Sequence, residues 1–170
     1  ELNGVWHFRR EYPATPAEAF RAEIPGALWS RALCDEMRVN PEDMPPLTRI
    51  AVSLDPATTS KKTSDAWGNI WGGKAANGHV YIVGDESAVL KPDVAARRAI
   101  GVIEEQQGNE IVYEANQGGD MVPTIIKLVC KAMDVSPIRC VGVSASKAKR
   151  ARAEPVHTLC VDGRVHIVGS

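Results

Sequence analysis

The stretch from Glu110 to Met121 constrains the fold more than any other part of the chain. It begins with the β-prone run Ile111-Val112-Tyr113, and Gly118-Gly119 breaks this run. An apolar pattern of helical period follows from Val122. The stretch therefore predicts a strand, a turn and a helix, with Glu114 at the carboxyl end of the strand. Open α/β sheets usually place their sites at such strand ends.

Segments of similar pattern on both sides extend this unit into a sheet with helices. Further β-prone segments lie at 50–54, 66–73, 79–83, 138–143 and 164–168. Helical patterns lie at 93–107, 120–133 and 147–159. Asn77-Gly78 is a strong hairpin-turn dipeptide and joins the second and third strands. The order β-β-β-α-β-α-β-α-β predicts an α/β protein with a mixed β-sheet flanked by helices.

The first 48 residues differ from the rest in composition. They are rich in proline, Thr15-Pro16 has the pattern of a helix start, and 40–46 has the composition of a linker. We expect 1–48 to be an extension of another domain, packed on or leading into a main domain that begins at Arg49. The chain starts at Glu1 without methionine, which suggests a fragment or a processed protein.

Composition and missing motifs narrow the possible functions. A net charge of −1 gives no global attraction to nucleic acid, so any such binding needs a local patch. No apolar run of about 18 residues and no leader pattern is present, so neither a membrane span nor a signal peptide is expected. No Gly-x-x-x-x-Gly-Lys-Ser/Thr motif occurs, which excludes a P-loop ATPase domain from these residues. Widely spaced thiols indicate a reduced cytosolic protein without a zinc site: Cys34, Cys130, Cys140 and Cys160.

Two acidic residues follow strands in the same way. Asp55 ends the first strand and Glu114 ends the fourth, and these strands can be neighbours in a mixed sheet. Two carboxylates that lie close together repel each other unless a cation or a proton is shared between them. Carboxylate oxygens suit Mg²⁺ or Mn²⁺, and two such ions can support phosphodiester cleavage. The alternative is that each acid is a solvated residue at a strand end.

Three segments carry a resemblance to a known family. They are Glu114-Ala-Asn-Gln-Gly-Gly-Asp-Met121, Asp55-Pro56-Ala57 and Lys149-Arg-Ala-Arg-Ala-Glu-Pro-Val156. Together they resemble the nuclease domain of the large subunit of phage DNA-packaging terminases. Residues 8–20 resemble the stretch that ends the ATPase motor in the same family.

This resemblance implies an RNase H-like fold for 49–170 and assigns 1–48 to the end of the ATPase motor domain and its linker. It implies an endonuclease that cuts concatemeric double-stranded DNA with two Mg²⁺ or Mn²⁺ ions. It further implies a packaging ATPase domain in the same polypeptide, a terminase small subunit and a portal as partners, and action in the host cell cytoplasm.

Carried over residue by residue, Asp55 matches the first metal-binding acid of the family and Glu114 matches the second. Asp65 lies where relatives often have another acid. The third acid of the family is an aspartate on a helix after the last strand, and no candidate for it is present here. Asp162 precedes that strand in an Asp-Gly turn, and Asp120 is placed to cap a helix. We therefore expect the nuclease domain to be incomplete at its C-terminus, with an incomplete metal site.

A basic stretch opens the last predicted helix, where backbone N–H groups also attract anions. It predicts contacts with DNA phosphates, and the alternative is a solvated helix face. We call it the basic segment, and its cations are Lys147, Lys149, Arg150 and Arg152.

Other residues and other functions have weaker support. His79, His157 and His166 lack metal-ligand spacing, and Trp67 and Trp71 are expected to belong to the core. Two other functions remain open: a Holliday-junction resolvase or transposase-type nuclease, and a non-catalytic module that binds DNA or the motor.

Overall fold

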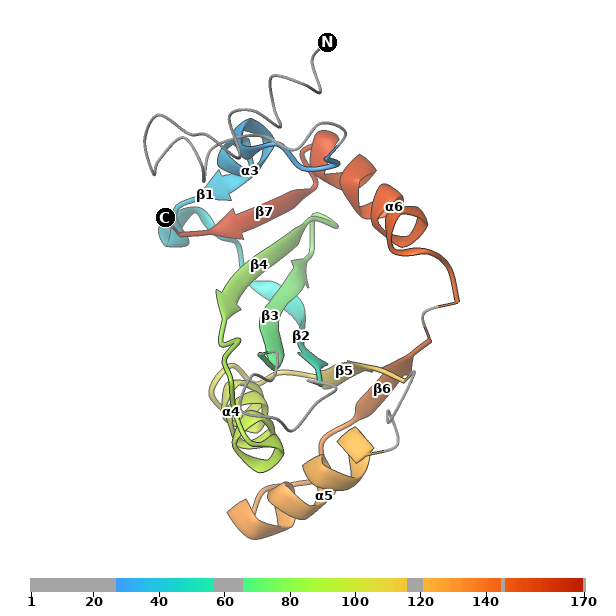
Figure 1. The fold of residues 1–170 in the computed structure, drawn as a ribbon. Helices are drawn as coiled ribbons and strands as arrows, with labels where there is room; N and C mark the ends of the chain where they lie inside the picture. Colours follow the sequence, from blue (N-terminus) through green and yellow to red (C-terminus); the bar gives the residue numbers. More distant parts are fainter. Residues whose placement is uncertain (1–26, 57–65, 116–120, 145, 170) are drawn as a thin grey trace, which may run out of the picture.

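The computed structural model describes residues 27–56, 66–115, 121–144 and 146–169, which form a seven-stranded mixed sheet with helices on its faces (Figure 1). The order of strands in the sheet is β1-β7-β4-β3-β2-β5-β6. The strands are β1 (Arg38–Val39), β2 (Leu47–Asp55), β3 (Gly68–Ala75), β4 (Val80–Asp85), β5 (Glu110–Glu114), β6 (Cys140–Val143) and β7 (Val165–Val168). The predicted mixed sheet is confirmed.

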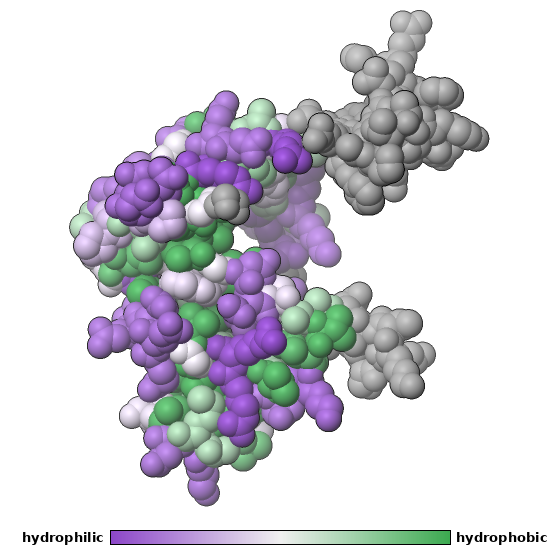
Figure 2. Space-filling model, turned by 90° about the vertical axis from the view of Figure 1, so that its left-hand side faces the viewer, coloured by the Kyte–Doolittle hydropathy of each residue, from purple (hydrophilic) through white to green (hydrophobic). Residues whose placement is uncertain are grey.

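Among the described residues, the three longest helices lie between strands in the predicted order, and two short helices precede β2. They are α3 (Arg31–Glu36), a short 3-10 helix η1 (Pro41–Asp43), α4 (Pro92–Glu105), α5 (Met121–Met133) and α6 (Lys149–Val161). Within the described ranges, no helix is long and apolar enough to cross a membrane. Hydrophilic residues dominate the side shown in Figure 2, and hydrophobic residues form smaller areas between them.

The strands β2, β3 and β4 form an antiparallel meander. The turn between β3 and β4 falls on Asn77-Gly78, as predicted. Gly78 has a φ of +84°, which glycine adopts without a Cβ clash, and its N–H donates to the Ala75 carbonyl at 3.0 Å. The Asn77 side chain accepts from the backbone of His79 at 2.9 Å. The turn fixes the register of the hairpin and therefore the face on which each side chain lies.

The main core lies between one face of the sheet and the helices α4 and α5. Its strand residues Val52, Leu54 and Ile111 are at most 1% exposed, and they pack with Ile100 of α4 and Ile126 of α5. Full burial of side chains of this size stabilises a fold by roughly 1.5–3 kcal/mol each. This cluster fixes the ends of β2 and β5 against two helices, so the residues that follow are held on a rigid support.

The two tryptophans belong to this core, as predicted. Trp67 is buried and Trp71 packs against the same cluster. Trp67 lies just ahead of β3 and makes an isolated bridge to Ala88, so β3 begins later than the predicted segment 66–73.

A second, smaller core lies over β7 on the other face of the sheet. Met37, Cys160 and Val165 are buried there, with Trp29 and Leu33 packed against them. The two-residue strand β1 pairs in parallel with β7, so residues ahead of Arg49 contribute to the sheet. Residues 27–48 are therefore packed on the main domain. Their assignment to the end of a motor domain stays a prediction.

The cysteines and histidines have structural surroundings. All four cysteines are free thiols, and Cys130 and Cys160 are buried. His79 and His166 are joined by a 2.8 Å contact between Nδ1 and Nε2, and the His166 ring stacks on Tyr81. His157 packs edge-on against Trp29, with ring centroids 5.9 Å apart.

Candidate active site

The structure places Asp55 and Glu114 next to each other. Strands β2 and β5 are parallel neighbours, and their last registered pair is Leu54 with Tyr113. Asp55 and Glu114 are the next residue on each strand, and both strands end there. Neighbouring strands lie about 4.8 Å apart, so the two backbones are within reach of one shared ion. The expectation that the first and fourth strands are neighbours is confirmed.

Both acids lie on the face of the sheet opposite to α4 and α5. Side chains alternate along a strand, and Val52 and Leu54 point into the core beneath these helices. Asp55 therefore points to the other face, together with Ser53. The registered pairs give Glu114 the same face as Val112. Asp55 is exposed and Glu114 is half-buried, so neither acid is enclosed in the core.

A glycine keeps space open beside the first acid. Gly68 pairs with Asp55 across the antiparallel ladder, and a Cβ built at Gly68 would lie 3.2 Å from the Asp55 Cβ. A larger residue at this position would force the Asp55 side chain to shift. On the other side, Glu114 pairs with Val143 of β6, and the Ala115 N–H donates to the Val143 carbonyl at 2.9 Å. The ladder thus continues past Glu114 and fixes its backbone.

Within the described structure, no other acid considered from the sequence lies beside Asp55 and Glu114 as a third ligand. Asp65 and Asp120 lie outside the described residues. Asp162 caps the C-terminal end of α6 just before β7. Since β7 runs parallel to β4 and begins beside Val80, Asp162 is at the opposite end of the sheet from Asp55. It forms the Asp-Gly turn that the sequence predicted.

Asp85 is an acid at the same end of the sheet that the sequence reasoning missed. It ends β4 and pairs with Ile70, which pairs with Ser53, so it lies two strands and two residues from Asp55, which corresponds to about 12 Å. Its carboxylate accepts the Ser87 N–H at 2.9 Å, and hydrogen bonds from the side chain and backbone of Ser87 lower the pKa of Asp85. Asp85 is therefore engaged in a local turn and is too far away to share an ion with the pair.

The donor set suits a hard divalent cation but is small. Carboxylate oxygens are the ligands that Mg²⁺ and Mn²⁺ prefer, and both ions keep several waters. Within the described residues, no group of three or more His, Cys, Asp or Glu side chains is arranged to hold a metal ion. Asp55 and Glu114 therefore fit one ion as a partial set of ligands, and a second ion needs a further acid.

The basic segment follows the strand beside Glu114. It begins four residues after Val143, and α6 starts at Lys149 with Ala148 at the N-cap. Alanine has no side-chain oxygen to cap the first N–H groups of the helix. Two cations of the segment have local partners: Arg150 pairs with Glu154 at 3.6 Å, and the Arg152 Nε donates to the Lys147 carbonyl at 3.1 Å. All four cationic side chains are exposed.

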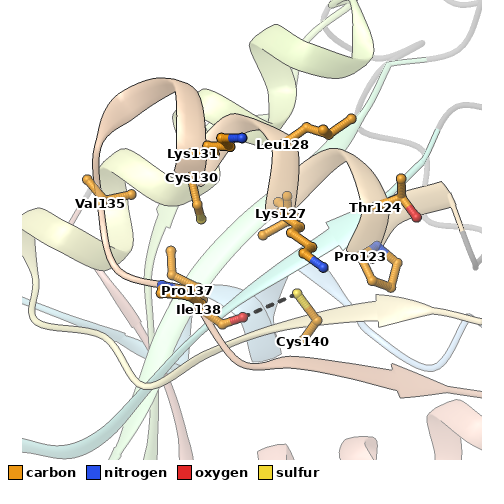
Figure 3. A pocket seen from close by; sticks show the side chains of 11 residues that line it. Pro123, Thr124, Lys127, Leu128, Cys130, Lys131, Val135, Pro137, Ile138 and Cys140 are labelled. Atoms are coloured by element: carbon orange, nitrogen blue, oxygen red, sulfur yellow. Dashed lines mark hydrogen bonds between the residues drawn. The ribbon is translucent and has the colours of Figure 1, made fainter.

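A separate groove of about 790 Å³ lies between α5 and the segment that leads into β6 (Figure 3). Apolar residues such as Ile126 and Val135 line it, and Lys127 and Lys131 also contribute. The Cys140 thiol donates to the Ile138 carbonyl at 3.6 Å inside this groove, and burial raises the pKa of that thiol. A protonated thiol is a poor nucleophile, so the groove offers no evident chemistry.

Superposition on solved structures identifies the class of fold. The nuclease domain of the large terminase subunit gp2 of the bacterial virus Sf6 superposes with a TM-score of 0.54 at 11% identity, covering 78% of this chain and 54% of that one. A mutant gp2c of the same subunit, solved with calcium, gives 0.58 at 12% identity, covering 84% and 74%. The large terminase of bacteriophage HK97 gives 0.57 at 13% identity, covering 98% and 41%. The fold is therefore that of an RNase H-like terminase nuclease domain.

The family follows from the sequence. The family described as "Terminase RNaseH-like domain" matches residues 52–170. The chain belongs to this family, and the resemblance inferred from its motifs is confirmed. It spans about half the length of the Sf6 gp2 nuclease domain that it matches. No curated protein matches the chain.

Proposed function

We propose that this RNase H-fold nuclease domain is a Mg²⁺- or Mn²⁺-dependent endodeoxyribonuclease that cuts concatemeric duplex DNA during packaging of a viral genome. The observation that carries the proposal is the placement of Asp55 and Glu114 at the ends of two adjacent parallel strands. Structures of the Sf6 nuclease domain with manganese and with calcium support a divalent cation in this fold.

In this proposal the two carboxylates act as ligands and leave the proton transfers to water. Asp55 and Glu114 would hold a divalent ion through one or more oxygens each, and Gly68 would leave room for it. A bound pair of ions would activate water and stabilise the leaving oxygen of the phosphodiester. The exposed position of Asp55 allows a DNA phosphate to approach the ion from the open face of the sheet.

The pair needs a third acid for two ions. Two carboxylates offset only part of the four positive charges of two divalent cations. The third ligand would be the family's aspartate on a helix after the last strand, with Asp65 and Asp120 as alternatives. We therefore expect a site that holds only these two acids to bind one ion weakly and to support little nicking. Mn²⁺ should support more activity than Mg²⁺, because it generally binds such sites more tightly.

The remaining partners follow from the family. We propose that the basic segment contacts DNA phosphates, and that the nuclease works with a packaging ATPase of the same polypeptide, a terminase small subunit and a portal. The site of action would be the cytoplasm of the host cell.

The test is the nicking of supercoiled plasmid over a Mn²⁺ titration by the natural polypeptide that contains these residues. Asp55→Asn and Glu114→Gln should each abolish nicking. Glu105→Gln removes the same charge from the exposed end of α4 and should leave it unchanged. Wild-type rates for either site variant would remove that residue from the site.

Substrate choice separates the alternatives. Preference for a four-way junction over linear duplex would favour a resolvase. Tight DNA binding without any nicking by the natural polypeptide would favour a non-catalytic module.

A further inference from the structure

A buried glutamate with two exposed arginines lies at the other end of the strands that carry the acid pair. Glu110 begins β5, and its side chain is only 4% exposed. Its Oε1 accepts a hydrogen bond from Arg49 of β2, and its Oε2 lies 3.6 Å from the Nε of Arg139, just ahead of β6. We call these three residues the Arg–Glu–Arg triad. No local sequence pattern indicates the triad, because its members are far apart in the chain.

The triad has more positive charge than a buried carboxylate needs. One arginine would neutralise Glu110, whereas two leave the group with one net positive charge. The arginine side chains are 61% and 72% exposed, so they reach solvent while their positions are fixed by the glutamate. Each guanidinium has five N–H donors in a planar fork, and only one nitrogen of each contacts Glu110 in the described structure. The outward donors are free to bind an anion, and such forks match phosphate geometry.

The triad and the acid pair share one face of the sheet. Glu110 and Glu114 are four residues apart on β5, so they point to the same face about 13 Å apart. A shallow groove of about 400 Å³ on this face is lined by Arg49 and Glu110 at one end. It is also lined by Ser53 and Val112, which lie two residues before Asp55 and Glu114. The groove thus leads from the triad toward the acids.

Lys74 extends the positive charge at the triad end. It pairs directly with Arg49 across β2 and β3, is exposed, and lines the same groove. Asp162, at the end of α6, is also at this end of the sheet but precedes β7, which lies on the far side of β4. The open face therefore has cations at one end and carboxylates at the other.

We propose that the Arg–Glu–Arg triad binds a backbone phosphate of the duplex whose scissile phosphate lies at Asp55 and Glu114. The spacing of about 13 Å corresponds to fewer than four nucleotides along one strand, because phosphates wind around the duplex and are farther apart than the axial rise of about 3.4 Å each. It is also close to the width of the major groove, about 12 Å, so the spacing fits a phosphate on either strand. Glu110 acts as a positioning residue that holds both guanidiniums toward the groove. This inference rests on the proposed nuclease function.

The experiment measures the affinity of a fluorescein-labelled 30-base-pair duplex by anisotropy between 50 and 200 mM salt, in EDTA so that no cleavage occurs. Arg49→Gln with Arg139→Gln should lower the slope of log K against log salt by about 0.9 and weaken binding about fivefold at 0.15 M, as expected for one lost phosphate contact. The matched control is Arg97→Gln with Arg98→Gln, two exposed arginines of α4 on the opposite side of the sheet. The control should stay within about twofold of wild type.

A further variant excludes a purely structural effect. Removing both arginines leaves Glu110 buried without a partner, so Glu110→Gln is added to neutralise the triad. This triple variant should unfold at a urea concentration close to that of wild type and should show the same loss of slope. Arg49→Lys with Arg139→Lys keeps the charge and should retain the slope.

The outcomes separate this inference from the proposed function. If wild type binds and nicks duplex DNA while the triad variants keep its salt slope and affinity, the triad inference is wrong and the nuclease proposal stands. If the natural polypeptide neither binds nor nicks duplex DNA, both are wrong.

Discussion

Replacing Asp55 by asparagine should remove most of the stability that Mn²⁺ gives to the folded chain. A ligand that binds only the native state stabilises it by RT ln(1 + [L]/Kd). A site with two carboxylates is weak, and we take a Kd on the order of 1 mM, as in the weakest calcium sites. At 10 mM Mn²⁺ the expected gain for wild type is then about 1.4 kcal/mol. Asp55→Asn should gain less than about 0.3 kcal/mol.

The metal-free protein should respond in the opposite direction. The side chain of Asp55 is exposed, so asparagine costs no packing. Two carboxylates about 5 Å apart in water repel each other by about 0.8 kcal/mol. Removing one charge should therefore raise metal-free stability by up to about 0.8 kcal/mol.

The assay is urea unfolding followed by far-UV circular dichroism, with EDTA or with 10 mM MnCl₂. With a slope near 2 kcal/mol/M, the wild-type midpoint should rise by about 0.7 M in Mn²⁺. Glu105→Gln has the same change in charge on an exposed helix position and should keep the full rise. If Asp55→Asn keeps it too, the ion binds elsewhere and the reasoning is wrong.

Three further predictions concern neighbouring features. Gly68→Val should reduce the Mn²⁺-induced rise in the urea midpoint, because its Cβ would crowd Asp55; an unchanged rise would show that the site tolerates a side chain there. Burial and, to a smaller extent, the electrostatic effect of His79 lower the pKa of His166. The unfolded state therefore binds more protons than the folded state, and the free energy of unfolding should fall as the pH drops below about 6.5. His166→Asn should lessen the difference between urea midpoints at pH 7.5 and 5.5, and an equal difference would exclude this cause. Neutralising the basic segment should weaken duplex binding equally for all DNA sequences and flatten the dependence of log K on log salt. An unchanged salt slope would favour a solvated helix face. The residues to replace are Lys147, Lys149, Arg150 and Arg152.

Much of the fold could be predicted because its strands and helices have clear local patterns. The run Ile111-Val112-Tyr113 and the apolar period from Val122 both gave elements of the expected type. Asn77-Gly78 fixed a hairpin, because few other residues adopt its backbone geometry. The sequence allowed the adjacency of Asp55 and Glu114, since a mixed sheet can place the first and fourth predicted strands side by side with their carboxyl ends at one edge.

Other features depend on contacts between distant residues and have no local pattern. Strand β1 has only two residues and exists because it pairs with β7, so the sequence of Arg38-Val39 alone could not indicate it. No local pattern distinguishes Glu110 from an exposed polar residue at the start of a strand. Only the fold shows that it is buried between Arg49 and Arg139, one on each neighbouring part of the sheet.

The central claim is that Asp55 and Glu114 share a divalent cation. Anomalous diffraction from crystals soaked in Mn²⁺, with data collected on both sides of the manganese absorption edge, tests it directly. The account predicts a manganese peak within coordination distance of both carboxylates, and no peak there in Asp55→Asn crystals. A manganese ion that contacts only one of them, or that lies at Asp85 instead, would contradict the account.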